Sequence, residues 1–425
     1  MKITTAQFQS QVELPAILAF DVSKDRLNLA TRIAGRMSDY EFDNRTSVIE
    51  ERLTAFKRRA HMAGYQRVLV VCEPTGCYHR PLMQSAHRLG LETAWVSGEA
   101  VSKMRAIETN DSGKTDIKDP HVIHSLASLG KTLIYRRYEE PYSLLREWSG
   151  LYDQADVSVV RAKCLLASQL KELFPDYSFK KDFLYGNSGQ ALVEHYGCNP
   201  YRIIRSGEVR FAQVMRKRVP RIRQKTIELL FAQAQSSVRH QISPRVSELL
   251  EYRLKQSWQD YLLHQSRKTE AARQMVALYQ EARLDDPKLP QAEKGVITTF
   301  HLARIIAETG PISDFSDLRK LVRYAGLNLR EKQSGTYRGK TRISKKGRSP
   351  LRKILSQIVL PLVKREALFG PYYHGKKERD GMPGTKAMTA VMRKFLKLFY
   401  GWYHSGGAFD RKRVFACESQ HRIAA

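Results

Sequence analysis

The sequence has few cysteines and no long apolar run, and both shortages narrow the class of protein. Its five cysteines are scattered through 425 residues and form no CxxC pair, so neither a disulfide framework nor a structural zinc site is expected. No stretch reaches the roughly 18 apolar residues that cross a bilayer, and residues 1–7 have no secretory pattern. We therefore expect a cytoplasmic protein with no membrane partner.

Acidic residues are scarce relative to basic ones, but only in part of the chain. The net charge is +29, from 72 Lys and Arg against 43 Asp and Glu. Residues 1–140 contain 20 basic and 17 acidic residues, whereas residues 141–425 contain the other 52 and 26. A near-neutral first part followed by a strongly basic remainder indicates a polyanionic partner, most simply nucleic acid.

Apolar runs in residues 1–140 predict a sheet whose later strands are separated by helices. Residues 16–23 and 67–73 are apolar runs typical of buried strands, and residues 26–33 and 39–43 alternate as half-buried strands do. With the intervening helices the order is β-β-β-α-β-α-β-α, which is that of an α/β ribonuclease-H-like fold. In this arrangement the ends of the first and fourth strands are adjacent, and a late helix packs beside them.

Four carboxylates are placed so that this topology would bring them together. Asp21 and Glu73 each end an apolar strand. Asp116 and Asp119 lie three residues apart at the start of a helix, so both project from one face. Mg²⁺ prefers hard oxygen ligands, and two such ions stabilise the oxygens of phosphoryl transfer. Singly each acid also suits a strand end or a helix N-terminus, but together they predict a two-metal site. Lys114 is a candidate phosphate contact.

The middle of the chain, residues 141–290, is predicted to be a helical connector. Amphipathic spacing runs from Leu144 to Phe174 and again from Ser243 to Leu284, where a narrow apolar stripe indicates a coiled-coil hairpin or a dimer seam. A dense basic run lies between them and is either a solvated helix end or a contact with a nucleic-acid backbone. Its candidate contact residues are Arg216, Lys217, Arg218, Arg221 and Arg223.

Residues 291–425 are predicted to form a mainly α-helical basic domain around a glycine-containing loop at 330–348. The loop places Ser334 before a glycine among crowded cations, which would lower the pKa of the hydroxyl and stabilise a phosphorane-like transition state. A phosphate-binding loop without a nucleophile fits the spacing equally well, and Ser344 is the rival hydroxyl. The candidate nucleic-acid contacts here are Arg338, Lys340, Arg342, Lys345, Lys346 and Arg348.

Taken in order, these motifs resemble the DEDD transposases of insertion sequences, in the one-ten/eleven-eleven class now described as bridge-RNA-guided recombinases. The resemblance covers most of the chain. It implies a RuvC-like domain over 1–140, a coiled-coil connector over 141–290 and a C-terminal transposase domain over 291–425. The residues that carry it are Asp21, Glu73-Pro74-Thr75-Gly76, Lys114-Thr115-Asp116 with Asp119, Gly326-Leu327, Gln333-Ser334-Gly335 and Ile343-Ser344-Lys345-Lys346-Gly347.

The resemblance implies an RNA-guided DNA transposase or recombinase of a mobile element. The four acids would bind Mg²⁺, two ions with Mn²⁺ as an alternative, and Ser334 would form a covalent phosphoserine link with DNA. The implied partners are donor and target DNA, a structured guide RNA and a second copy of the chain, in a homodimer or tetramer with composite active sites. The expected location is the bacterial or archaeal nucleoid. The alternatives are a Holliday-junction-type nuclease that uses metal-activated water and a non-catalytic nucleic-acid-binding regulator.

Overall fold

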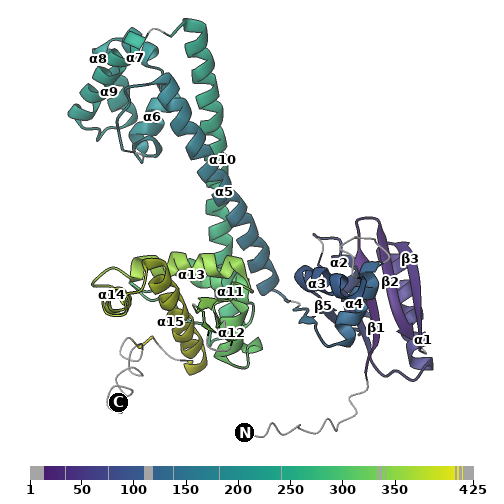
Figure 1. The fold of residues 1–425 in the computed structure, drawn as a ribbon. Helices are drawn as coiled ribbons and strands as arrows, with labels where there is room; N and C mark the ends of the chain where they lie inside the picture. The colour runs from purple at the N-terminus through teal and green to yellow at the C-terminus, as the bar shows by residue number, and fades with distance from the viewer. Residues whose placement is uncertain are drawn as a thin grey trace. The chain divides into compact units, whose positions relative to one another are not determined.

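The chain forms two compact units, Met1–Arg137 and Tyr138–Ala425, and each is described by itself (Figure 1). The predicted boundary at residue 140 lies close to this division, and the predicted second and third domains both fall in the second unit. No helix in the described ranges has the length and apolar content to cross a bilayer. The structure is a computed structural model that describes residues 14–33, 35–74, 76–109, 118–136, 138–180, 182–240, 242–331, 333–334, 337–339, 341–406, 409–410 and 414.

A six-stranded mixed sheet forms the centre of the first unit, in the order β3-β2-β1-β4-β5-β6. The β1–β4 and β4–β5 pairs are parallel, and the other neighbours are antiparallel. The predicted order of elements is found, with a second helix after β5 and the two-residue β6 added; so short a strand leaves no periodic pattern in the sequence. The strands are β1 (Ala16–Val22), β2 (Arg26–Ile33), β3 (Arg36–Asp43), β4 (Val68–Cys72), β5 (Glu92–Trp95) and β6 (Leu133–Ile134).

Helices cover both faces of this sheet, which explains why β4 and, apart from Asp21, β1 are apolar. Phe20 and Cys72 pack with α1 and α2 on one face. Ala19 and Val71, the alternate residues of the same strands, pack with α3 and α4 on the other. The helices are α1 (Thr46–Met62), α2 (Arg80–Arg88), α3 (Gly98–Thr109) and α4 (Lys118–Ser128).

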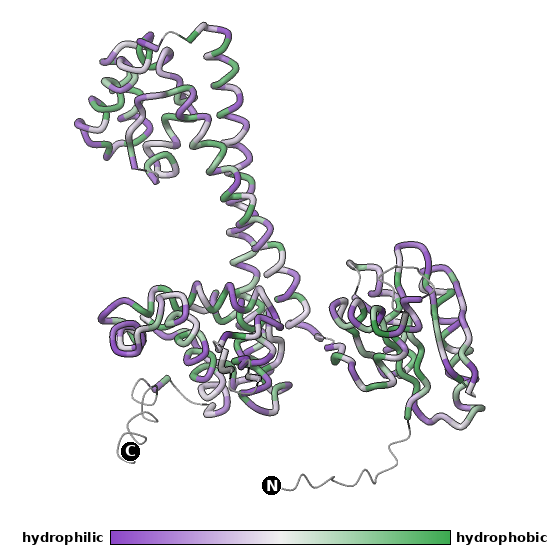
Figure 2. The backbone as a smooth tube through the Cα atoms, viewed as in Figure 1, coloured by the Kyte–Doolittle hydropathy of each residue, from purple (hydrophilic) through white to green (hydrophobic). Residues whose placement is uncertain are grey.

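Two long helices organise the second unit. α5 (Tyr142–Leu173) and α10 (Pro244–Asp285) pack side by side and antiparallel (Figure 1). Hydrophilic and hydrophobic positions alternate along both (Figure 2), as the amphipathic spacing predicts. The Ser243 hydroxyl caps α10 by accepting a hydrogen bond from Val246 N. The helical pair is thus established, whereas its coiled-coil character stays a prediction.

A helical head lies between the two long helices in sequence and has its own apolar core. Gly189 packs closely on Leu184: a Cβ on Gly189 would lie 2.3 Å from the Cα of Leu184. The three helices that follow α6 were not predicted. The head consists of η1 (Phe183–Tyr185), α6 (Asn187–Tyr196), α7 (Pro200–Ser206), α8 (Glu208–Arg218), α9 (Gln224–Ser237) and η2 (Val238–His240).

A second apolar core joins the start of α5 and the end of α10 to the C-terminal helices. α13 ends at Leu362, one residue after Pro361, which cannot donate a helical hydrogen bond. The elements are α11 (Thr299–Thr309), η3 (Ile312–Asp314), α12 (Leu318–Tyr324), β7 (Leu329–Arg330), β8 (Gln333–Ser334), β9 (Tyr337–Arg338), β10 (Arg342–Ile343), α13 (Ser349–Leu362), α14 (Gly370–Glu378) and α15 (Gly384–Ser405).

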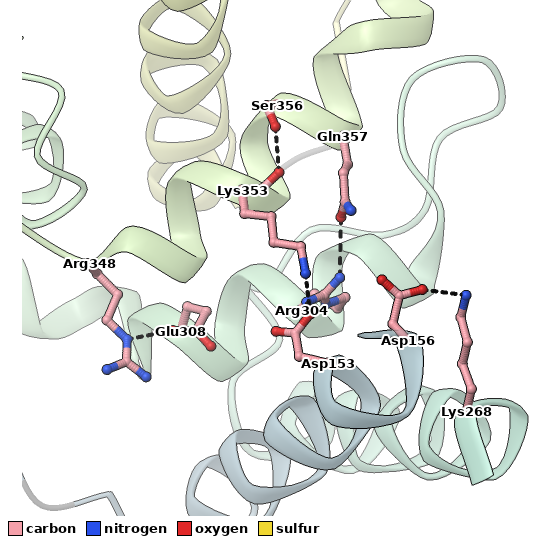
Figure 3. Close-up of polar contacts among 9 residues, drawn as sticks. All are labelled: Asp153, Asp156, Lys268, Arg304, Glu308, Arg348, Lys353, Ser356 and Gln357. Carbon is pink, nitrogen blue, oxygen red and sulfur yellow. Dashed lines mark hydrogen bonds and ion pairs between the residues drawn. The ribbon is translucent and has the colours of Figure 1, made fainter. Parts of the chain in front are cut away.

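A buried arginine ties three of these helices together. Arg304 of α11 is 1% exposed. Its Nη2 donates to Asp153 Oδ1 of α5 at 2.8 Å, and its Nη1 donates to Gln357 Oε1 of α13 at 3.2 Å (Figure 3). Lys353 Nζ, also on α13, donates to the same Asp153 oxygen at 3.0 Å. This polar cluster fixes the C-terminal helices on α5.

Candidate active site

Asp21 and Glu73 occupy matched positions on two neighbouring parallel strands. Phe20 pairs with Cys72 in the β1–β4 register, and each acid is the next residue along its chain. Neighbouring strands lie about 4.8 Å apart. Because side chains alternate between the faces of a sheet, both carboxylates belong to the face covered by α3 and α4.

The charges of both carboxylates affect the pKa of the Cys72 thiol. Burial raises the pKa of Cys72, and the charges of Asp21 and Glu73 raise it further, to about 12. The two acids therefore create a common negative field at this edge of the sheet. Such a field attracts a cation and keeps the thiol protonated.

The first residue of α3 approaches Glu73 so closely that only glycine fits. A Cβ built on Gly98 would lie 2.4 Å from Glu73 Oε1. The missing side chain leaves the space in which the carboxylate rests, so Gly98 positions Glu73. Gly98 was not among the predicted site residues; the pattern that could have identified it is a glycine at the start of a helix, shortly after a strand.

α4 carries Asp119 in its first turn and packs against β1 and β4. Asp119 is only 3% exposed. Arg105 of α3 donates to its Oδ1 from Nε at 2.9 Å and from Nη2 at 2.6 Å. This buried ion pair supplies positive charge to one of the predicted ligands. Arg105 was also missed, because its partner lies 14 residues away, on the next helix.

The donor set suits a hard divalent cation, since every predicted ligand is a carboxylate. Asp21, Glu73 and Asp119 belong to elements that meet on one face of the sheet. Among the described residues, no three His, Cys, Asp or Glu side chains lie close enough together to hold a metal ion. Asp116 and Lys114 lie outside the described residues. The convergence of all four acids therefore stays a prediction.

The two candidate serines of the second unit differ in their surroundings. Ser334 is exposed on a two-stranded ribbon, where it pairs with Tyr337 of β9. Ser344 is half-buried, and its Oγ donates to Asn328 Oδ1 at 2.5 Å. Its backbone N also donates to Asn328 O at 2.8 Å. Ser344 is therefore engaged in holding the loop, whereas Ser334 is presented to solvent.

Glycines close this loop onto the protein's own backbone. Gly347 has φ +154, and a Cβ there would lie 2.4 Å from Tyr324 O and 2.5 Å from Gly326 N. Next to it, Arg348 N donates to Tyr324 O at 2.7 Å. At Gly347 the close approach is therefore to the protein's own backbone.

The predicted nucleic-acid contacts lie in two places in the second unit. Arg348 Nε pairs with the buried Glu308 carboxylate at 2.5 Å and so anchors the loop to α11 (Figure 3). Lys340 lies outside the described residues, and Arg338 is described only as part of β9. The other eight are exposed: Arg216, Lys217, Arg218, Arg221, Arg223, Arg342, Lys345 and Lys346.

Two family models match the chain. Residues 20–175 match a model for DEDD transposases of the IS110 type, described as "Transposase". Residues 296–374 match a model described as "Transposase IS116/IS110/IS902 family". The two segments together span more than half of the chain; the first contains the four acids and the second contains both serines. A comparison with curated proteins gave no match.

Proposed function

Because the chain belongs to the IS110 family of transposases, and is therefore a DNA-transposing enzyme, we propose that its two units divide the chemistry of strand transfer. The family implies a divalent metal ion, and the all-carboxylate donor set favours two Mg²⁺ ions over softer metals. In the second unit, Ser334 is the nucleophile. The acids proposed to hold the ions are Asp21, Glu73, Asp116 and Asp119.

The observation that carries this proposal is the β1–β4 register. It gives Asp21 and Glu73 matched positions on parallel strands, and Gly98 leaves room for the Glu73 carboxylate beside them. α4 brings Asp119 to the same face. Bound ions would stabilise negative charge on the attacking and leaving oxygens of an in-line displacement.

The proposed covalent step exchanges one phosphodiester for another. The Ser334 oxygen bonds to a DNA phosphorus while the bond from that phosphorus to a deoxyribose oxygen breaks. The serine hydroxyl gives up a proton and the released deoxyribose oxygen takes one up, so charge balances. Because a phosphoserine ester replaces the broken ester, the strand can be rejoined without an external energy source. The exposure of Ser334 on its ribbon suits attack on a large substrate.

We further propose that a structured guide RNA selects the donor and target DNA. The exposed basic side chains of the second unit suit binding to nucleic-acid backbones without base readout. The acids and Ser334 lie in different units, which suits a homodimer or tetramer in which the serine of one copy meets the acids of another. A discrete co-purifying RNA with loops complementary to two DNA sites is the expected finding.

Substitution of the serine tests the proposed chemistry directly. Ser334→Ala should abolish the protein–DNA adduct that survives denaturation, because no other hydroxyl is proposed to attack. Ser344→Ala is the matched control and should keep the adduct. Asp21→Asn should also lose the adduct while DNA binding remains. An adduct formed by Ser334→Ala but not by Ser344→Ala would reassign the nucleophile. Cleavage with no adduct in any variant would support the metal-activated-water nuclease.

A further inference from the structure

The helical head has a surface charge that its fold does not require. It lies between the two segments that match the family models and packs around its own core. Within residues 202–225 there are nine basic residues and one acidic residue, Glu208. All nine are exposed: Arg202, Arg205, Arg210, Arg216, Lys217, Arg218, Arg221, Arg223 and Lys225. We call these nine the head patch.

The head patch lacks the carboxylate partners that basic residues have elsewhere in the second unit. On α10, Arg253 pairs with Glu172, Lys268 with Asp156 and Arg273 with Glu270. Within the described part of the chain, the only residue of the head patch in an ion pair is Arg202, whose partner is Glu251. Clustered cations of this kind repel one another until a polyanion neutralises them.

Residues from different helices of the head converge on His195. Arg202 Nη2 of α7 donates to His195 O at 3.2 Å. Burial lowers the pKa of His195, and the charges of Arg218, Arg202 and Arg210 lower it further. α7 and both ends of α8 therefore present positive charge to one region. Three residues of the head patch, Arg202, Arg210 and Arg218, therefore lie around one point of the folded head.

A helix end explains only part of this charge. Arg216, Lys217 and Arg218 form the last turn of α8, where cations favour the helix dipole. The other six residues of the head patch lie outside that turn. Arg210 and Lys217 are seven residues apart and share one face of α8, away from the face of the buried Phe211 and Met215. The helix thus buries one side and turns basic residues outward on the other.

Residues 206–225, which contain seven of the nine head-patch residues, include only one aromatic residue, Phe211. Phe211 is buried in the core of the head. The exposed Tyr252 of α10 lies beside the other two head-patch residues, in a pocket that Arg202 and Arg205 also line. Proteins that bind single strands combine positive charge with exposed aromatic rings. A basic stretch without exposed rings suits the phosphate backbone of a duplex.

We propose that the head patch docks the backbone of double-stranded DNA. The choice of DNA rests on the proposed function, whose substrate is DNA, whereas the docking itself needs neither the metal nor the serine. The interaction is independent of base sequence, because arginine and lysine contacts to phosphate carry no sequence information. The helical head would thus bind a duplex segment of the DNA that does not itself react.

The test is equilibrium binding of a short mixed-sequence DNA duplex to the full chain in EDTA, followed by fluorescence anisotropy over a range of salt concentrations. The patch variant is Arg210→Gln, Lys217→Gln and Arg221→Gln together. The control is Arg253→Gln, Arg267→Gln and Arg273→Gln, which removes the same charge from exposed positions on α10. The slope of log affinity against log salt should fall by about 3 in the patch variant, roughly 0.9 per lost phosphate contact, and by less than about 1 in the control.

Each outcome decides the proposal. Equal losses of slope in the two variants would overturn it, since net charge alone would then explain binding. Tight binding of duplex RNA with no binding of duplex DNA would overturn the choice of DNA. Replacing the same three residues by Lys, where they are Arg, should keep the slope and confirms that charge is what matters. Because EDTA removes the metal, failure of the cleavage chemistry leaves this result unchanged.

Discussion

At the scale of single residues, we expect the contact between Gly98 and Glu73 to affect DNA cleavage and to have little effect on the stability of the fold. Gly98→Ala forces the Glu73 carboxylate to move, because the new Cβ would lie 2.4 Å from its Oε1. The carboxylate ends a flexible side chain, so we expect the unit to fold with nearly unchanged thermal stability. Metal-dependent DNA cleavage should fall by about 10²-fold, the usual effect of a 1 Å misplacement.

The matched control for this prediction is Gly150→Ala in α5, where a new Cβ meets nothing within 4 Å. That variant should cleave DNA at the wild-type rate. Wild-type cleavage by Gly98→Ala as well would show that the position of Glu73 does not limit the reaction.

The Arg105–Asp119 pair makes a second prediction at this scale. Arg105→Gln leaves the buried Asp119 carboxylate without its cation and should destabilise the first unit by about 3–5 kcal/mol. A divalent ion should restore part of this loss, because a ligand that binds only the folded state stabilises it. Thermal unfolding with and without Mg²⁺ measures both effects.

Lys103→Gln is the control on the same helix, since Lys103 and Glu99 form an exposed pair, which contributes only about 0.3–0.5 kcal/mol. An identical Mg²⁺-induced rise in melting temperature for the wild type and Arg105→Gln would mean that Arg105 does not substitute for the ion.

These residues also show how far the sequence predicts the site. Asp21 and Glu73 were identified because apolar strands end at them, and the strand order was sufficient to make them neighbours. Gly98 and Arg105 were missed because their roles depend on how α3 packs against the sheet, which no local pattern encodes. Ser334 and Ser344 were equivalent by spacing; their exposure and the hydrogen bonds from Ser344 to Asn328 distinguish them.

At the scale of elements, Glu251 of α10 holds α7 in the head. Its carboxylate accepts hydrogen bonds from Asn199 Nδ2 at 3.0 Å and Lys255 Nζ at 2.6 Å and pairs with Arg202. Burial by itself raises the pKa of Glu251, but these hydrogen bonds and the nearby charges lower it overall from 4.5. The folded head therefore binds this proton less tightly than the unfolded chain does.

The lowered pKa of Glu251 makes the stability of the head depend on pH in the acid range. Stabilisation by Glu251 is full above the unfolded pKa of 4.5 and is lost as the pH falls through the lower folded pKa. Glu251→Gln should cost about 1–3 kcal/mol at neutral pH and should flatten the fall in stability at acid pH. Urea unfolding followed by the fluorescence of Trp258, a core residue of the head, measures both.

Glu248→Gln is the control, because Glu248 is exposed one turn earlier on α10. It should keep the wild-type pH profile. A Glu251→Gln profile as steep as that of the wild type would assign the acid sensitivity to other groups.

The long helices could be predicted from sequence and the short ones could not. α5 and α10 carry periodic apolar stripes over many turns, so their limits fall within two residues of those expected. α7 has seven residues, too few for a periodic signal, and it depends on the Asn199 cap and on packing in the head. α13 ends at Leu362 because Pro361 disrupts its last turn.

At the scale of the whole molecule, the apolar residues fall into separate clusters. The first unit has one on each face of its sheet, and the second has one in the head and one around the C-terminal helices. The sequence indicated the near-neutral first part and the basic remainder. It did not indicate that the head builds a core of its own, because that core draws on residues far apart in the chain.

The helical pair also sets the distance between the two cores that it joins. On α10, Trp258 belongs to the core of the head and Leu278 to the C-terminal core, and 20 residues of helix measure about 30 Å. One turn of B-form DNA measures about 34 Å. The distance between these two residues along α10 is thus close to one helical repeat of duplex DNA. Lengthening both helices by seven residues would add about 10 Å and shift the phase at which the two surfaces meet a duplex.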